Sequence, residues 1–472
     1  MTVNMEKLVH LNSARSRGIH EDERVEAMLK ELEEEFMVSD EKMRDIIKEF
    51  HQEMDNGLKG KESSLPMIPS YVTKRPTGKE KGSYLALDLG GTNLRVCLVQ
   101  LKGDSTFDME QMKYPIPAEA KASTLFEFIA DCVEKFLFLH KVPVDPSLGY
   151  VPCGFTFSFP VNQTGIKRGN LVMWNKGFSV PNAVGRDVVN MTQDAFMRHH
   201  LRVKIVALVN DTVGSLMTSG YSFPNAQMGI IFGTGTNACY WEKASKIEKY
   251  NGDDKDSIDE MVINMEWGAF DNALKLLPYT PYDNKLNRKS PNFGLQSYEK
   301  MISGMYLGEV ARNALLWMID RRALFGGRSS TELNTGYGFD TSYVSTIVAD
   351  ESADLEEVRV VIELSLNIPE TTLKDRQTVK RVCRLVGDRA KKLSAAAMCA
   401  VLLWRPELLD SEEGVSVGID GSMYQFYPEF EESLIEESKK FLGEERASRL
   451  KLVLSKDGSG VGAAIVAMIA TN

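Results

Sequence analysis

Nearly the same glycine-containing string occurs twice in this chain, and each copy lies between two segments that are predicted to be strands. The first copy is DLGGTN (Asp88 to Asn93) and the second is FGTGTN (Phe232 to Asn237). Because SYLAL precedes the first copy and LRVCLVQL follows it, its glycines are expected to turn one strand directly into the next. The repeat predicts a weak internal duplication in which each half begins with a strand–turn–strand unit.

Glycine turns of this kind are suited to phosphate binding. Without a Cβ, backbone N–H groups approach phosphate oxygens closely, and Thr92, Asn93 and Thr234 add small side-chain donors. A Rossmann fingerprint or a P-loop would need its glycines to open a helix, and neither motif occurs here in that context. A plain hairpin turn explains either copy alone, so the phosphate interpretation depends on the pair.

Length and charge narrow the class of protein further. The 472 residues, 43% of them hydrophobic, are enough for two well-packed domains. The formal net charge of -10 argues against nucleic acid as a partner. The six cysteines show no metal-ligand spacing, which favours reduced thiols in the core. The late apolar run from Ala463 to Ala470 is too short for a membrane span, and a cytoplasmic protein is predicted.

Hydrophobic periodicity predicts alternating strands and helices. Two amphipathic helices are expected near the N-terminus, over 25–36 and 43–54, with Ser39 as an N-cap between them. The segment KIVALV (Lys204 to Val209) is predicted to be a buried strand that ends at Asn210 and Asp211. Long helices are expected in the second half, over 297–324, 376–404 and 429–442.

An ordered set of motifs then resembles the eukaryotic hexokinase and glucokinase family. The motifs are LALDLGGTNLRV, GFTFSFPVNQTGIKRGNLVMWNKGF, ALVNDTVGSL, GIIFGTGTNACY, INMEWGAFDN, SYEKMISGMYLGE, VGIDGS and SKDGSGVGAA. They extend from about Met43 to the C-terminus, and so many motifs in one order form a specific signal. Because one fold hosts many activities, function has to be argued from the site.

The resemblance implies an α/β fold of the two-lobed, actin-like ATPase (ribonuclease H-like) type, with duplicated mixed sheets flanked by helices and a central cleft. It implies a small lobe formed by 78–212 and 458–472. A large lobe would comprise 20–77 and 213–457, and 1–19 would be a flexible N-terminal arm.

The implied activity is hexokinase activity: ATP-dependent phosphorylation of glucose and related hexoses at the 6-hydroxyl, the first step of glycolysis. Phosphoryl transfer depends on in-line positioning and on stabilisation of charge. A carboxylate should accept the hydroxyl proton, and by resemblance Asp211 is that general base, with Lys176 as a catalytic cation. The alternative for Asp211 is an N-cap of the following helix, and for Lys176 a solvated lysine.

Three further sets of residues follow from the resemblance. The hexose would be bound by Ser158, Phe159, Asn175, Lys176, Asn210, Asp211, Asn237, Glu266, Gln296 and Glu299. ATP would be bound by Asp88, Gly90, Gly91, Thr92, Asn93, Arg95, Thr234, Thr341, Ser345, Gly421, Ser422 and Ser459. Asp88 would hold Mg²⁺ through water. For Glu266 the alternative is a structural salt bridge, and for the late glycines simple turns.

The sequence departs from the family pattern at one sugar contact. The related motif reads Trp-Thr-Lys-Gly-Phe, and this chain has Asn175 in place of the threonine. The asparagine side chain is longer than that of threonine and carries an amide donor and a carbonyl acceptor, so the hexose preference could shift. Two alternatives therefore stay open: a kinase with a shifted substrate such as N-acetylglucosamine, and a weakly active sugar-sensing paralogue.

The expected partners are a hexose and ATP, with no nucleic acid, and the chain would be a monomer or a homodimer.

Overall fold

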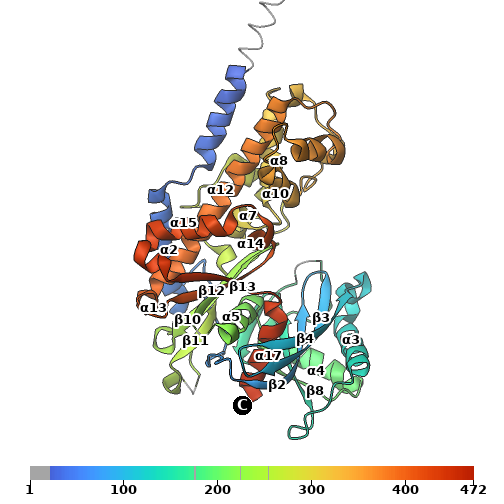
Figure 1. The fold of residues 1–472 in the computed structure, drawn as a ribbon. Coiled ribbons are helices and arrows are strands. Elements are labelled where there is room, and N and C mark those ends of the chain that lie inside the picture. Colours follow the sequence, from blue (N-terminus) through green and yellow to red (C-terminus); the bar gives the residue numbers. More distant parts are fainter. Residues whose placement is uncertain (1–21, 175–176, 224, 253–254, 472) are drawn as a thin grey trace, which may run out of the picture.

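The computed structural model describes residues 22–174, 177–223, 225–252 and 255–471. The fold contains two large mixed sheets with helices packed on both (Figure 1). Each copy of the glycine string joins two neighbouring antiparallel strands of its own sheet, so the predicted strand–turn–strand units are confirmed.

The first sheet has five strands in the order β4-β3-β2-β5-β8. Strand β3 is antiparallel to both β2 and β4, whereas β5 runs parallel to both β2 and β8. Helices α3 and α4 share one hydrophobic core with this sheet. The bounds are β2 (Lys81–Leu89), β3 (Asn93–Lys102), β4 (Phe107–Pro115), β5 (Val151–Phe157), β8 (Val203–Val209), α3 (Leu125–His140) and α4 (Val188–Arg198).

The second sheet has six strands in the order β1-β11-β10-β9-β12-β13. Its central hairpin, β9 to β10, carries the second glycine string, and β12 lies parallel to β9 on the other side. The bounds are β1 (Ile68–Pro69), β9 (Ala226–Phe232), β10 (Thr236–Lys243), β11 (Glu260–Asn264), β12 (Val415–Asp420) and β13 (Leu450–Leu454). A separate two-stranded hairpin is formed by β6 (Val161–Gly165) and β7 (Arg168–Leu171).

A layer of helices packs with this second sheet around one large hydrophobic core. The long helix α12 (Leu373–Trp404) packs between α2 (Asp40–Leu58) and α15 (Phe430–Leu442), and residues 22–36 are also helical. Ser39 caps α2 as predicted, with its side chain accepting from the backbone N–H of Lys42. The remaining α-helices of this layer are α6 (Pro281–Lys289), α7 (Ser297–Ile302), α8 (Leu307–Asp320), α9 (Thr331–Asn334), α10 (Thr341–Ala349), α11 (Glu356–Arg359), α13 (Pro406–Leu409), α14 (Ser422–Phe426) and α16 (Glu444–Ser448).

The single helix predicted over 297–324 is wrong, because α7 and α8 are separated at Ser303–Tyr306. The break has a tertiary cause. The backbone N–H of Gly304 donates to the carbonyl of Gly233, at 2.8 Å, instead of continuing a helix. A Cβ on Gly304 would stand 3.0 Å from that same carbonyl oxygen. The chain therefore leaves helical geometry in order to support the second glycine turn.

Helices α5 (Asp211–Ser222) and α17 (Gly458–Thr471) lie between the two sheets (Figure 1). Their hydrophobic core includes residues from both sheets, such as Ala86 and Trp241. The two helices approach so closely that a Cβ on Gly462 would lie 2.0 Å from the carbonyl oxygen of Gly214. The glycine-rich end of the sequence thus serves helix packing at the junction of the sheets.

All six cysteines are buried as free thiols, in the core as predicted. Burial raises the pKa of Cys97, Cys132, Cys239 and Cys399 to about 12, so these thiols stay protonated near neutral pH. No described helix has the length and apolar character needed to cross a membrane.

Candidate active site

The first glycine turn is tight and exposes its backbone. Gly90 donates its backbone N–H to the carbonyl of Asn93 at 3.1 Å, which closes the turn between β2 and β3. The carbonyl of Thr92 accepts from the N–H of Ile116 at 2.9 Å. The Asn93 amide donates to the Thr92 hydroxyl at 2.8 Å, so two small polar side chains stand together at the tip. This arrangement offers hydroxyl, amide and backbone N–H groups to an anion.

Backbone hydrogen bonds support the second glycine turn. Gly233 donates to the carbonyl of Gly235 at 3.0 Å, and Met305 donates to the carbonyl of Thr234 at 3.1 Å. Gly421 has a φ of 117°, and a Cβ there would lie 2.3 Å from the carbonyl oxygen of Phe232. Glycine is therefore required at 421, where the end of β12 meets the turn.

Asp211 stands at the carboxyl end of β8, immediately before α5 turns away. The N-cap of α5 is Asn210, whose side-chain oxygen accepts from the backbone N–H of Thr212 at 2.9 Å. Asp211 is the first residue of the helix itself. The carboxylate of Asp211 accepts from the same Thr212 N–H at 2.9 Å, so it makes a capping contact beside that of Asn210, and this contact is compatible with a role as base.

Arg95 gathers a group of carboxylates next to the first glycine turn. Its guanidinium pairs with Asp88, at 2.9 Å from Nε, and with Asp457, at 2.8 Å from Nη1. Burial opposes the charge of Arg95, but the two carboxylates outweigh it and the pKa of Arg95 is raised. The ion pairs join β3 to the residue just before α17.

Asp420 and Asp211 complete this group. Burial raises the pKa of Asp420, and the nearby charges of Asp457 and Asp211 raise it further, against the lowering effects of the Gly421 N–H and Arg95. Electrostatic interactions thus link four carboxylates to one another or to the Arg95 guanidinium, namely those of Asp88, Asp211, Asp420 and Asp457. We call these four residues and Arg95 the Arg95 group.

The Arg95 group carries an excess of negative charge beside the first glycine turn. Asp88 and Asp457 pair with Arg95, and Asp420 interacts with it and with Asp211. Carboxylate oxygens are ligands that Mg²⁺ prefers. Asp88, the predicted metal contact, is buried and held in place by Arg95.

A second set of polar side chains lies around the second glycine turn. Asn237 donates its amide to the side-chain oxygen of Asn264 at 2.8 Å and to Glu266 at 3.2 Å. Asn264 donates in turn to the same Glu266 oxygen at 2.9 Å. Glu266 thus accepts from two amides at the carboxyl end of β11, which satisfies a carboxylate placed beside the buried Trp267.

Glu299 and Gln296, at the start of α7, face the same turn. Glu299 accepts from the backbone N–H of Thr236 at 2.9 Å. A Cβ on Gly268 would lie 2.4 Å from the Gln296 side-chain oxygen, so Gln296 packs directly against the loop after Glu266. Four predicted hexose residues are therefore brought to one place, namely Asn237, Glu266, Gln296 and Glu299.

The other predicted hexose residues are placed differently. Ser158 adjoins the first glycine turn, since its backbone N–H reaches the carbonyl of Leu89 at 3.4 Å. Phe159 is buried, with its ring 5.2 Å from that of Trp174 and 4.9 Å from that of Phe178, so its side chain belongs to the core. Asn175 and Lys176 lie outside the described residues.

The residues predicted for the adenosine end are partly engaged in the fold. Thr341 is buried and its hydroxyl accepts from the N–H of Gly308 at 2.8 Å, and Ser345 lies one turn later on α10. Ser422 begins α14, directly after Gly421. Ser459 is buried, and its carbonyl accepts from the hydroxyl of Thr156 at 2.8 Å.

Three residues of the site were missed from the sequence: Asn264, Asp420 and Asp457. Asp420 carries a local signal, since it is an acid at the end of an apolar strand and directly before a glycine. Asn264 and Asp457 carry no local signal, because only tertiary contact shows their partners.

Comparisons with known proteins agree with this geometry. Two sequence profiles, both described as hexokinase, match residues 28–221 and 227–469. Hexokinase-1 of Schizosaccharomyces pombe is 40% identical over 447 residues, which cover 93% of this chain and 90% of the relative. A glucokinase of Aspergillus niger is 40% identical over 461 residues, 90% of this chain and 93% of the relative.

Solved structures show the same likeness. A hexokinase from Schistosoma mansoni in complex with glucose superposes with a TM-score of 0.86 at 35% identity. The match covers 95% of this chain and 99% of that structure. A second hexokinase crystal structure gives a TM-score of 0.81 at 30% identity, again over 95% of this chain and 99% of the other.

Proposed function

Because the chain belongs to the hexokinase family, we propose that it transfers the γ-phosphoryl group of ATP to the 6-hydroxyl of glucose and related hexoses. The observation that carries the proposal is the position of Asp211. Its carboxylate stands at the end of β8, near enough to Asp420 to raise the pKa of that residue, and Asn210 supplies the N-cap of α5. A base beside a phosphate and metal site is what hydroxyl phosphorylation requires.

The proposed roles follow from the two sets of side chains. Asn237, Glu266 and Glu299 hydrogen-bond sugar hydroxyls, while Gln296 borders them, so that the 6-hydroxyl is held toward Asp211. Asp211 accepts the hydroxyl proton as the new O–P bond forms. The backbone N–H groups of the two glycine turns donate to phosphate oxygens, where transition-state charge develops.

Hexokinases act on ATP with a divalent metal, and we propose Mg²⁺ at the Arg95 group, bound to Asp88 through water. The cation would neutralise phosphate charge during transfer. The ion pair with Arg95 holds the Asp88 carboxylate in position for this contact. Asn175 and Lys176 keep their proposed roles as a sugar contact and a catalytic cation, on the resemblance alone.

The lobes, 78–212 with 458–472 and 20–77 with 213–457, remain a proposal. In this division the two glycine turns belong to different lobes, and closure around the hexose would exclude water from the transfer. The cytoplasmic location and the monomeric or dimeric state also stay predictions.

A matched pair of sugars tests the activity. ADP release in the presence of ATP and Mg²⁺ is expected with glucose and is expected to fall to the background ATPase rate with 6-deoxyglucose, which lacks only the accepting hydroxyl. Fructose, mannose and N-acetylglucosamine define the range of substrates. The absence of hexose-dependent ADP release with all four sugars would reject the enzyme.

The comparisons do not favour the two alternatives, a kinase with a shifted substrate and a sugar-sensing paralogue. They remain distinguishable by the same assay. Turnover with N-acetylglucosamine well above that with glucose would support the first, and sugar binding without ADP release would support the second.

Replacing Asn264 with alanine is expected to raise KM for glucose by about 10–100-fold, with a smaller change in kcat. Asn264 holds Asn237 and Glu266 through two hydrogen bonds, and a bond to a charged group contributes roughly 1.5–3 kcal/mol. Steady-state kinetics with glucose varied measure the effect. Asn225→Ala, at the opposite end of the same sheet, is the control and should leave KM unchanged; an unaltered KM in Asn264→Ala would show that Asn264 does not position the site.

A further inference from the structure

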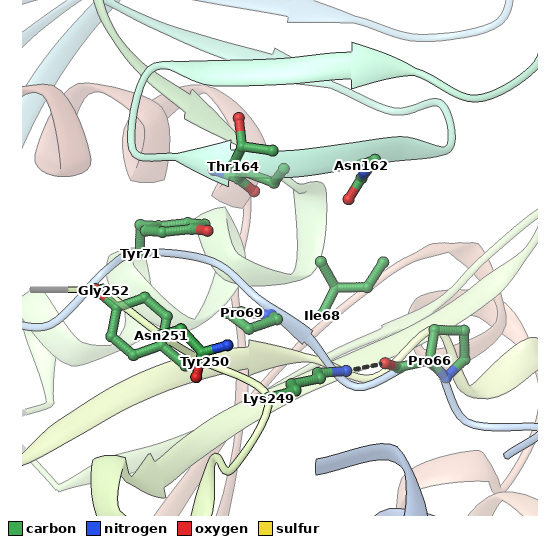
Figure 2. Close-up of a pocket in the computed structure, with 11 residues that line it drawn as sticks. Pro66, Ile68, Pro69, Tyr71, Asn162, Thr164, Lys249, Tyr250, Asn251 and Gly252 are labelled. Atoms are coloured by element: carbon green, nitrogen blue, oxygen red, sulfur yellow. Dashed lines mark hydrogen bonds between the residues drawn. The ribbon is translucent and has the colours of Figure 1, made fainter. Parts of the chain in front are cut away.

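A hollow of about 610 Å³ lies between β1 of the six-stranded sheet and the β6–β7 hairpin, and it shares no lining residue with the candidate active site. Three segments line it: residues 66–71 around β1, residues 162–164 of β6, and residues 249–252 (Figure 2). None of its lining residues belongs to the predicted hexose or nucleotide sets. Its size falls within the range of small-molecule pockets, roughly 300–1,000 Å³.

The walls of this hollow differ in chemistry. Ile68 and Pro69 form an apolar floor, and the side chains of Asn162 and Thr164 lie opposite on β6 (Figure 2). Lys249 is half-buried along the floor, and its Nζ donates to the carbonyl of Pro66 at 2.5 Å. Among the residues that the structure describes, no carboxylate lies within ion-pair distance of this ammonium group.

Burial lowers the pKa of Lys249 to about 8. The half-buried ammonium has lost part of its hydration, and a single carbonyl is a weak substitute for a counter-charge. An anion that enters the hollow would restore the missing charge compensation, and a charge-assisted hydrogen bond is among the stronger polar contacts.

The hollow also spans elements that lead to both parts of the site. Gln163, on its β6 wall, donates its side-chain amide to the carbonyl of Ser70 at 3.2 Å and to that of Leu208 at 3.1 Å. Leu208 belongs to β8, the strand that ends at Asp211, and β1 pairs with β11, the strand that ends at Asn264. A ligand here would touch β6, which is hydrogen-bonded to β8 through Gln163, and β1, which pairs with β11.

We propose that this hollow is a binding site for a small organic anion, a carboxylate or a phosphate monoester, whose charged group pairs with Lys249 while its body lies between Ile68 and Asn162. The site is separate from the hexose and ATP residues. Its ligand would therefore bind outside the place where the hexose and ATP react.

Direct titration of the full chain tests the proposal independently of catalysis. Isothermal titration calorimetry at pH 7 uses citrate as the carboxylate, glycerol 3-phosphate as the phosphate monoester, and glycerol as the neutral control. We expect at least one anion to bind and glycerol not to bind. Lys249→Met should weaken that binding by about tenfold or more, since it removes the paired charge.

Two further variants keep this result interpretable. Lys246→Met removes a lysine from the same segment outside the hollow and should leave anion affinity unchanged, while Lys249→Arg should retain most of it. A thermal melt of each variant verifies folding. If neither anion binds the wild type, or if Lys249→Met binds as well as the wild type, the proposal is overturned.

Anion affinity should also fall between pH 7 and pH 9. Lys249 is mostly protonated below its pKa of about 8 and mostly neutral above it, so the attraction present at pH 7 is lost as pH rises. The other titratable groups among the lining residues are Tyr71 and Tyr250, and a phenol carries no positive charge that could attract an anion. An affinity that is equal at pH 7 and pH 9 would contradict pairing with Lys249.

Discussion

Replacing Asp211 with alanine is expected to lower kcat for glucose phosphorylation by about 10²–10⁴-fold, the usual contribution of a positioned general base. The variant can no longer accept the proton of the 6-hydroxyl as the phosphoryl group arrives. Hexose binding should weaken much less, because Asn237, Glu266 and Glu299 are held by contacts that do not involve Asp211. The expected signature is thus a collapse of turnover with sugar affinity largely kept.

The fold gives a reason to expect a cleanly interpretable variant. The N-cap Asn210 accepts from the Thr212 N–H, so α5 keeps this hydrogen bond after the substitution removes the second one, made by Asp211. The measurement is ADP release at saturating glucose and ATP, with glucose binding followed separately by calorimetry. Asp194→Ala, an exposed acid on α4, is the control and should retain wild-type turnover. A kcat for Asp211→Ala within tenfold of the wild-type value would remove Asp211 from the role of base.

The two glycine turns and Asp211 could be predicted because their signals are local. A glycine pair between two apolar runs specifies a hairpin, and an acid at the end of a buried strand emerges at a sheet edge. Their placement follows from neighbours within a few residues, so periodicity and turn chemistry were sufficient. The same is true of Ser39, whose capping role depends on a residue three positions later.

The Arg95 group could not be assembled from the sequence, because its members are far apart along the chain. Arg95 and Asp457 are separated by 362 positions, and only the packing of α17 between the sheets brings them together. The break between α7 and α8 escaped prediction for a similar reason. Gly304 stands in an otherwise helical pattern, and its contact with Gly233 decides the backbone geometry. Local propensity therefore failed where the chain supports the site from a distance.

Replacing Arg389 with methionine is expected to lower the free energy of unfolding by about 3–5 kcal/mol, the cost of leaving a buried charge without its partner. Arg389, on α12, donates to both carboxylate oxygens of Asp283, at 2.6 and 2.7 Å. The side chains are 0% and 2% exposed, so water cannot replace the lost contact. Asp283 also completes the capping box of α6 with Thr280, so an unpaired carboxylate there should disturb that helix as well.

The same substitution at Arg381, on the same helix, is the matched control. Arg381 pairs with Glu26 and Glu33 at the surface, where it is 36% exposed, and exposed ion pairs contribute about 1 kcal/mol or less. Denaturant unfolding of the wild type and both variants measures the difference, provided that the transition is reversible and the slope is unchanged. If Arg389→Met loses no more stability than Arg381→Met, burial does not increase the contribution of the Arg389–Asp283 pair to the free energy of unfolding. A large loss confined to Arg389→Met would show that the α6–α12 contact depends on a paired charge. Both substitutions remove a guanidinium group from α12, and the two positions differ in exposure.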